Sequence, residues 1–245
     1  MHISIFHPLA SGEQVFATLE PMGWTNPPGP WAELERRLSG RPPDADGGDS
    51  PAWSNQRGEY RPPAVPKCTT TVPYAELHCH SNFSFLDGAS HPEERVEEAA
   101  RRGLTALALT DHDGFYGIVR FAEAAAALHV PTIFGTELTL DLPRKSQAGA
   151  PDPGGRHLVV LARDPTGYAH LARAITAAHM SAGEKSLPKT DLATLAAAGS
   201  TGHWQILTGC RKGTVPAALL SEGPAAAARE LHRLTDAFGR DNVAV

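Results

Sequence analysis

The sequence is short of cysteine and of long apolar runs, and each shortage excludes a class of protein. Its three cysteines, Cys68, Cys79 and Cys210, are too few and too scattered for a disulfide framework, which favours a reducing compartment. No apolar run reaches the roughly 18–20 residues that a membrane span needs. The opening MHISIFHPLA has neither the basic start nor the apolar stretch of a signal peptide. We therefore expect a cytoplasmic protein with no membrane partner.

An excess of basic charge and a phosphate-binding glycine loop are also absent. The formal net charge of the 245-residue chain is −5, which argues against a broad nucleic-acid footprint but not against a local basic groove. No GxxxxGK motif is present, and no base is identifiable beside Cys79 or Cys210 for a thiol nucleophile. The 41% of hydrophobic and 20% of charged residues are typical of a soluble globular protein of one or two domains.

Residues 1–73 differ in composition from the rest of the chain. One short helix is expected from Trp31 to Leu38, ended by Gly40. Segment 41–66 is rich in Pro, Gly and Asp and cannot bury much apolar surface, so we expect a loop or a linker there.

From Tyr74 onward, short apolar runs alternate with amphipathic segments. The expected helix 90–103 has strong end signals, a capping box of Ser90 and Glu93 and a terminal Gly103. The other expected helices span 115–130, 167–180, 192–198 (capped by Asp191) and 224–239, and the expected strands span 74–80, 104–111, 131–140, 157–163, 203–209 and 241–245. This alternation predicts parallel β/α units. Because the chain stops inside an expected strand, we expect a fragment of something longer.

Two histidines, His78 and His80, flank Cys79 in the first expected strand. Residues i and i+2 of a strand face the same side, so both imidazoles project together while Cys79 points the other way. The spacing alone leaves two readings open, a pair of metal ligands or partly exposed polar residues.

Polar residues at the ends of other strands make a metal site the stronger reading. Asp111 and His112 lie at the end of strand 104–111, Glu137 lies near the end of the next, and Cys210 follows strand 203–209. The C-terminal ends of strands in a β/α barrel converge on one rim, where the active site lies. Taken singly, Asp111 could begin a turn, Glu137 could be a solvated side chain and Cys210 a small core residue. Together these residues offer the ligands that zinc or manganese takes.

Two further candidates are less well explained by their position. His157 lies before the apolar run of its strand, where a surface histidine or a capped strand start would serve as well. Asp87 lies in a loop beside Gly88, where an Asp-Gly turn is an equally good reading.

Five ordered motifs together resemble the PHP domain (polymerase and histidinol phosphatase). They are ELHCHSNFSFLDGAS, ALALTDHDGFYG, IFGTELTL, HLVVLARD and ILTGCRKG. More narrowly, they resemble the version at the amino terminus of bacterial C-family DNA polymerases. Segment 22–40 resembles the start of the error-prone members, and this makes Met22 an alternative start to Met1.

The resemblance implies an α/β fold, a distorted (β/α)7 TIM-like barrel that is truncated here before its last strand or strands. It implies an N-terminal extension and linker over 1–73 and an incomplete PHP domain over 74–245. Up to three divalent metal ions, zinc or manganese, are implied, with Asp111 orienting a ligand histidine. The implied metal-binding residues are His78, His80, Asp87, His112, Glu137, His157 and Cys210.

The resemblance also implies functions. The longer polymerase would carry out translesion synthesis in damage-induced mutagenesis, with DNA, its own further domains and other mutagenesis or replication proteins as partners. The Mg²⁺-dependent polymerase site is absent from these residues. The region itself would be a metal-dependent phosphoesterase resembling a 3′–5′ exonuclease, using metal-bound hydroxide, or a purely structural module. The alternative is a stand-alone phosphatase of a small ester such as histidinol phosphate.

Overall fold

The computed structural model describes residues 60–66, 72–140, 154–181, 183, 187–199 and 201–245. Contacts divide the chain between Glu59 and Tyr60, and all described residues belong to the second unit. The expected helix Trp31–Leu38 and most of the expected linker 41–66 lie outside the described residues.

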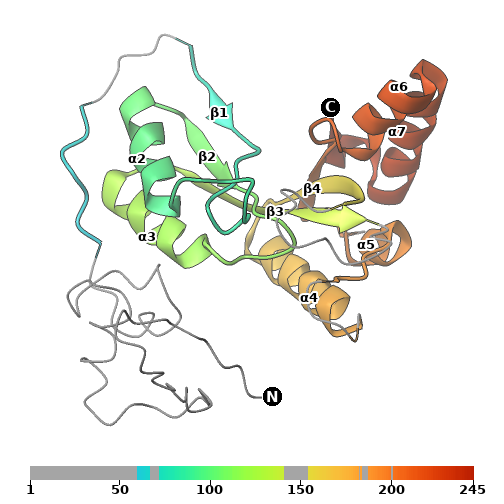
Figure 1. Ribbon diagram of the computed structural model, residues 1–245, viewed down its shortest axis with the longest axis horizontal. Coiled ribbons are helices and arrows are strands. Elements are labelled where there is room, and N and C mark those ends of the chain that lie inside the picture. The colour runs from blue at the N-terminus through green and yellow to red at the C-terminus, as the bar shows by residue number, and fades with distance from the viewer. Residues whose placement is uncertain (1–59, 67–71, 141–153, 182, 184–186, 200) are drawn as a thin grey trace, which may run out of the picture. The chain divides into compact units, whose positions relative to one another are not determined.

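The described residues of the second unit form six helices and six strands, which largely alternate along the chain (Figure 1). The helices are α2 (Pro92–Arg102), α3 (Ile118–Leu128), α4 (Pro165–Ser181), α5 (Leu192–Gly199), α6 (Thr214–Glu222) and α7 (Pro224–Phe238), with a 3-10 turn η2 (Arg240–Asn242). The strands are β1 (Ala75–Glu76), β2 (Ala106–Leu109), β3 (Thr132–Leu140), β4 (Arg156–Ala162), β5 (Trp204–Leu207) and β6 (Val243–Ala244). The predicted α/β fold class is confirmed, and the curled sheet forms an open part of a barrel.

The strands form one sheet in sequence order, β1-β2-β3-β4-β5-β6. Strands β1, β2 and β3 are parallel, and so are β5 and β6. Strand β4 runs antiparallel to both of its neighbours, so the prediction of uniformly parallel strands is wrong for β4. Leu140 pairs with Arg156, which means that the chain leaves β3 and enters β4 at the same end of the sheet. The segment between them carries no helical pattern, and a parallel connection needs a crossover, usually a helix.

The start of α2 is shifted by one residue from its predicted position. The N-cap is His91, whose backbone N–H donates to Glu94 Oε2 at 2.8 Å, so the predicted box of Ser90 and Glu93 is wrong in register. Pro92 explains the shift, because proline fits the first helical position and makes the preceding residue the cap.

Two other elements differ from expectation. Helix α6 has no counterpart among the predicted elements, since Pro216 in its first turn and the glycines at both ends obscured its pattern. The first strand is shorter than predicted, but the backbone continues beside β2. Thr110 N–H donates to Cys79 O at 2.8 Å.

Two apolar clusters hold the helices against the sheet. Val96, Phe121 and Leu109 are central to the cluster of α2 and α3, which pack next to β1 and β2 (Figure 1). Trp204 and Leu171 belong to the larger cluster between α4, α5, α7 and β3–β5. Burying such side chains is the main stabilising contribution, and it fixes the sheet whose edge carries the polar site.

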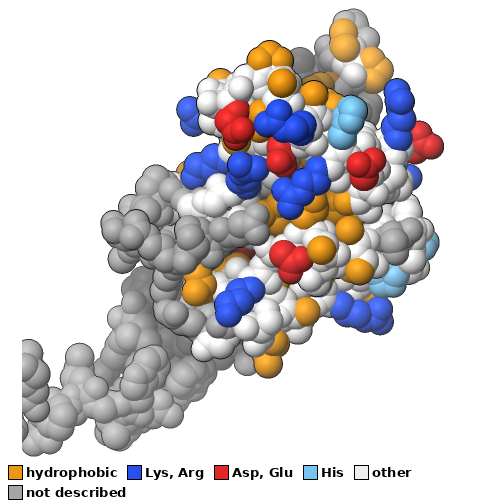
Figure 2. All heavy atoms as spheres, turned by 90° about the vertical axis from the view of Figure 1, so that its right-hand side faces the viewer, with side chains coloured by type: hydrophobic (Ala, Val, Ile, Leu, Met, Phe, Trp, Pro, Cys, Tyr) orange, Lys and Arg blue, Asp and Glu red, His pale blue; other side chains and the backbone are white. Residues whose placement is uncertain are grey.

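Charges of both signs are interspersed on the side of the unit that carries α6 and α7 (Figure 2). Among the described residues, helix α7 takes part in three ion pairs: Arg229 with Glu222, Arg233 with Glu230, and Glu230 with Arg156 of β4. Such mixed charge is typical of a solvated face. Within the described ranges, no helix has the length and apolar character to cross a membrane.

Candidate metal centre

The reversed direction of β4 places His157 at the rim of the site. Because β4 is antiparallel to β3, its first residues lie beside the last residues of β3, and His157 pairs with Thr139. Glu137 is two residues before Thr139 and therefore faces the same side of the sheet. His157 Nδ1 lies 3.3 Å from Glu137 Oε1, and both side chains are 1% exposed.

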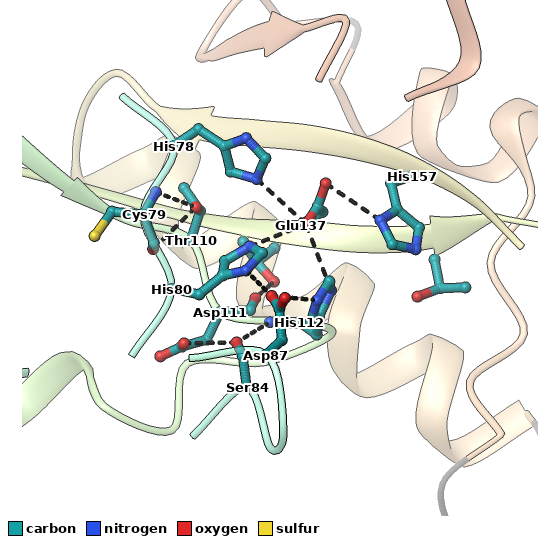
Figure 3. Close-up of polar contacts among 12 residues, drawn as sticks. His78, Cys79, His80, Ser84, Asp87, Thr110, Asp111, His112, Glu137 and His157 are labelled. Atoms are coloured by element: carbon teal, nitrogen blue, oxygen red, sulfur yellow. Dashed lines mark hydrogen bonds and ion pairs between the residues drawn. The ribbon is translucent and has the colours of Figure 1, made fainter. Parts of the chain in front are cut away.

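His78 and His80 reach the same place from the segment that follows β1 (Figure 3). Their ring centroids are 5.0 Å apart, and Nε2 of each ring points to Glu137 Oε2, at 3.2 Å from His78 and 2.9 Å from His80. Cys79 packs on the opposite side against the cluster of α2 and α3, and burial raises the pKa of its thiol. The predicted division of this segment into two faces is confirmed.

Glu137 is the centre of the site. Besides His78, His80 and His157, its Oε2 lies 3.5 Å from Nδ1 of His112. Burial alone would raise the pKa of Glu137, but the surrounding imidazoles outweigh it and hold the pKa well below its ordinary value. Glu137 is therefore an anion within a ring of nitrogen atoms.

Asp87 closes the site from the loop after His80. Its carboxylate contacts Nδ1 of His80 and lies 3.4 Å from Nε2 of His112. Burial opposes ionisation of Asp87, but the two histidines outweigh it and lower the pKa of Asp87. Burial likewise opposes protonation of His80, yet its two carboxylate neighbours raise the pKa of its ring.

The ligand atoms form three overlapping groups, each with all of its atoms within 4.8 Å of one another. The groups are His78–His80–Glu137, His80–Asp87–His112 and His112–Glu137–His157. Buried Nε2 of His78, Nε2 of His80 and both oxygens of Glu137 have no hydrogen-bond partner among the described residues, although they lie at ion-pair distances. Such atoms need compensation, and divalent cations coordinated by imidazole and carboxylate provide it. The donor set therefore fits metal ions.

The side chain of Asp111 contacts the loop that carries Asp87, through Ser81 and Ser84. Its carboxylate accepts hydrogen bonds from Ser81 N–H, Ser81 Oγ and Ser84 Oγ, each at 2.7 Å. Ser84 Oγ in turn accepts from the backbone N–H of His112 at 3.2 Å. These hydrogen bonds of Asp111 thus fix the loop that carries Asp87, whereas the resemblance implied a contact with a histidine.

The two serines were missed by the sequence reasoning. Ser81 is 0% and Ser84 2% exposed, and both follow the His-x-His segment within four residues. Two hydroxyl residues so close to a predicted ligand pair were the available signal.

The thiol of Cys210 is in none of the three ligand groups. It is an exposed free cysteine after β5. Its carbonyl accepts from Gly213 N–H at 2.8 Å, and Gly213 forms a β-bridge with His157. The structure therefore brings together six of the seven candidate ligands and places the loop of Cys210 beside the sixth, His157.

The chain also matches a known protein family and several curated proteins. The PHP domain family model matches residues 76–245. A curated protein named error-prone DNA polymerase, from Mycobacterium bovis, is 55% identical over 231 residues, covering 91% of this chain and 21% of its own length. A protein of the same name from Nocardia farcinica is 48% identical over 273 residues, covering 91% of this chain and 24% of its own length. The chain thus spans about a fifth of the length of these relatives.

Solved structures give a weaker likeness. The chain is similar to a two-domain protein from Bacteroides vulgatus whose description includes a PHP-like metal-dependent phosphoesterase. The TM-score is 0.39 and the identity 20%, with 66% of this chain and 47% of the other covered.

Proposed function

Since the chain belongs to the PHP domain family, we propose that residues 74–245 are a metal-binding PHP domain that hydrolyses phosphoesters. The bound ions would be divalent, zinc or manganese, and up to three in number. Imidazole and carboxylate suit both metals. The proposed ligands are His78, His80, Asp87, His112, Glu137, His157 and Cys210, the last by resemblance.

One observation carries this proposal, the buried carboxylate of Glu137 among four imidazoles. Its two oxygens point to different histidines, Oε2 to His78 and His80 and Oε1 to His157. A carboxylate so placed would be a ligand of the bound ions together with these histidines. When bound, such ions lower the pKa of coordinated water and neutralise the charge of phosphoryl oxygens.

Asp87 would set the orientation of His80. Its carboxylate would accept a hydrogen bond from His80 Nδ1–H, which leaves Nε2 to coordinate a metal as a neutral imidazole. Asp111, through Ser81 and Ser84, would hold the Asp87 loop in place for this contact.

A catalytic role is favoured over a purely structural one by the exposure of the site. The side chains of Asp87 and His78 are 33% and 23% exposed, whereas those of Glu137 and His157 are 1% exposed. A structural metal site is closed by protein ligands, but a catalytic site keeps one position open. The open side at Asp87 would give a phosphoester access.

We further propose that this domain is the N-terminal region of an error-prone DNA polymerase that acts in the cytoplasm. Its relatives bear that name at 55% and 48% identity. Translesion DNA synthesis in damage-induced mutagenesis, with its own Mg²⁺ ions, would belong to the remainder of the longer protein. DNA, those further domains and other mutagenesis or replication proteins would be its partners.

The substrate would then be a 3′ end of DNA. Hydrolysis would add water across the last phosphodiester, releasing a nucleoside 5′-monophosphate and leaving a new 3′-hydroxyl.

The test measures nucleotide release from 3′-labelled single-stranded DNA, with zinc or manganese, by the polymerase that contains this domain. His80→Ala should abolish release, whereas Glu98→Gln, which removes an exposed carboxylate of α2 from its arginine partners, should not. If wild type and His80→Ala are equally inert and His80→Ala only lowers thermal stability, the structural role replaces hydrolysis. Release of phosphate from histidinol phosphate but not from DNA would favour the stand-alone phosphatase.

A further inference from the structure

Two exposed apolar side chains lie at the tip of the loop that carries Asp87. Phe85 is 81% and Leu86 51% exposed. Single exposed apolar residues are ordinary on protein surfaces. This pair is unusual because Leu86 has a φ of 65°, a left-handed conformation that leucine rarely adopts. Such a backbone persists only where surrounding structure imposes it, and it points to a functional role.

The surrounding structure imposes this turn from its base. The N–H groups of Asp87 and Gly88 both donate to Ser84 O, at 3.0 and 2.8 Å. Ser84 is itself held by Asp111. A Cβ at Gly88 would lie 1.9 Å from the carbonyl oxygen of Ser81, so only glycine allows this close approach. The loop is therefore fixed at its base and presents Phe85 and Leu86 to solvent.

The same turn joins the exposed ring to the metal centre. Ser84 and Asp87 lie on one loop beside His80 and His112 (Figure 3). Phe85 is two residues before Asp87, so their Cα atoms are at most about 7.6 Å apart. An exposed aromatic ring on a fixed backbone is thus anchored next to the place where a phosphoester would be hydrolysed.

We propose that Phe85 stacks on the terminal base of a single-stranded DNA 3′ end whose last phosphodiester lies at the metal centre. This inference rests on the proposed function of that site. Bases stack on exposed aromatic rings without regard to sequence, because every base has a π-face. Phe85 would be a positioning residue that holds the strand, while Leu86 extends the apolar surface beside it.

A four-way binding experiment on the 245-residue chain tests the contact. Manganese-loaded wild type and Phe85→Ala are each titrated with two fluorescent oligonucleotides whose last linkage resists hydrolysis, one ending in a normal 3′ nucleotide and one in an abasic nucleotide. Wild type should prefer the normal end by about 5- to 150-fold, which corresponds to one stacked base. Phe85→Ala should lose this preference, and Phe85→Tyr should restore it.

The control removes an equally exposed apolar side chain elsewhere. Leu220 on α6 is 73% exposed, and Leu220→Ala should keep the wild-type preference. A preference unchanged in Phe85→Ala, or no binding of either DNA by wild type, would overturn the proposal. A third outcome would also overturn it: Phe85→Ala keeps the preference for the normal DNA end but associates more weakly with the separately produced remainder of the polymerase. The loop tip would then be a contact between domains.

The two proposals fail in different ways. A wild-type protein that distinguishes the DNA ends through Phe85 but releases no nucleotide refutes hydrolysis alone. A protein that releases nucleotide but shows the same preference with and without Phe85 refutes stacking alone.

Discussion

Replacing Glu137 by glutamine should remove most of the metal-dependent stability of this domain. Glutamine keeps the shape of the side chain but loses its negative charge and replaces one oxygen with an NH₂ group. Glu137 belongs to two of the three candidate ligand groups and contacts four histidines, so one change weakens coordination throughout the site. We expect metal affinity to fall at least about 100-fold, more than the loss of a supporting partner causes.

This loss converts into a measurable shift of the melting temperature. At a free metal concentration of 100 times Kd, binding stabilises the folded state by about 2.7 kcal/mol. A unit of the size of Tyr60–Val245 gains about 2–4 °C in Tm per kcal/mol, so the wild type should gain about 5–11 °C. A 100-fold weaker site at the same concentration retains about 0.4 kcal/mol, and Glu137→Gln should gain only about 1–2 °C.

Differential scanning calorimetry with and without zinc or manganese measures both shifts. Glu98→Gln is the matched control, because it makes the same chemical change at an exposed residue of α2 and should keep the wild-type shift. An equal metal-induced shift in Glu137→Gln and wild type would refute the central role of this carboxylate. The absence of any shift in wild type with either metal would refute the metal centre itself.

Three further outcomes are expected. Metal binding releases the proton of His80, whose pKa is raised by its carboxylate neighbours against the effect of burial, so affinity measured by calorimetry should rise with pH up to that pKa and level off above it. Gly88→Ala should weaken metal binding in the same titration, because its Cβ meets the carbonyl oxygen of Ser81 and displaces the Asp87 loop. Asp191→Ala should cost about 0.5–2 kcal/mol in urea denaturation at pH 7, because Asp191 caps α5 by accepting Thr194 N–H at 2.9 Å. Hydrogen bonds to Thr194 lower the pKa of Asp191, so this contribution is present above its unfolded pKa of about 3.9 and is lost as the pH falls through the folded value.

Local patterns predicted most of the secondary structure because the physics that sets those elements is itself local. Pro224 and the apolar face of the segment after it predicted α7 closely, and the apolar run after His157 predicted β4. Helix α6 was missed because Pro216 in its first turn is also a loop signal. Strand direction depends on pairing between distant segments, which periodicity does not encode.

Residue types at strand ends predicted a metal site, the family resemblance added Asp87 and His157, and the structure places six of the seven candidate ligands together. Spacing could draw attention to Ser81 and Ser84 but could not identify their partner Asp111, which is some 30 residues away in sequence. Only the packing of the loop against β2 brings them together. Hydroxyl groups that support a site carry a weaker sequence signal than the histidines and carboxylates that form it.

The reversal of β4 explains why His157 looked misplaced. A polar residue at the C-terminal end of a strand marks the active rim only if that strand runs parallel to its neighbours. Because β4 runs in the opposite direction, His157 at its start lies at the rim with Glu137. The residues that follow β4 lie at the opposite end of the sheet. Asp164 follows β4 and His203 precedes β5, and these two side chains pair with each other at 2.6 Å. Their pairing therefore belongs to the far end of the sheet, and strand direction separates this second histidine–carboxylate contact from the candidate metal centre.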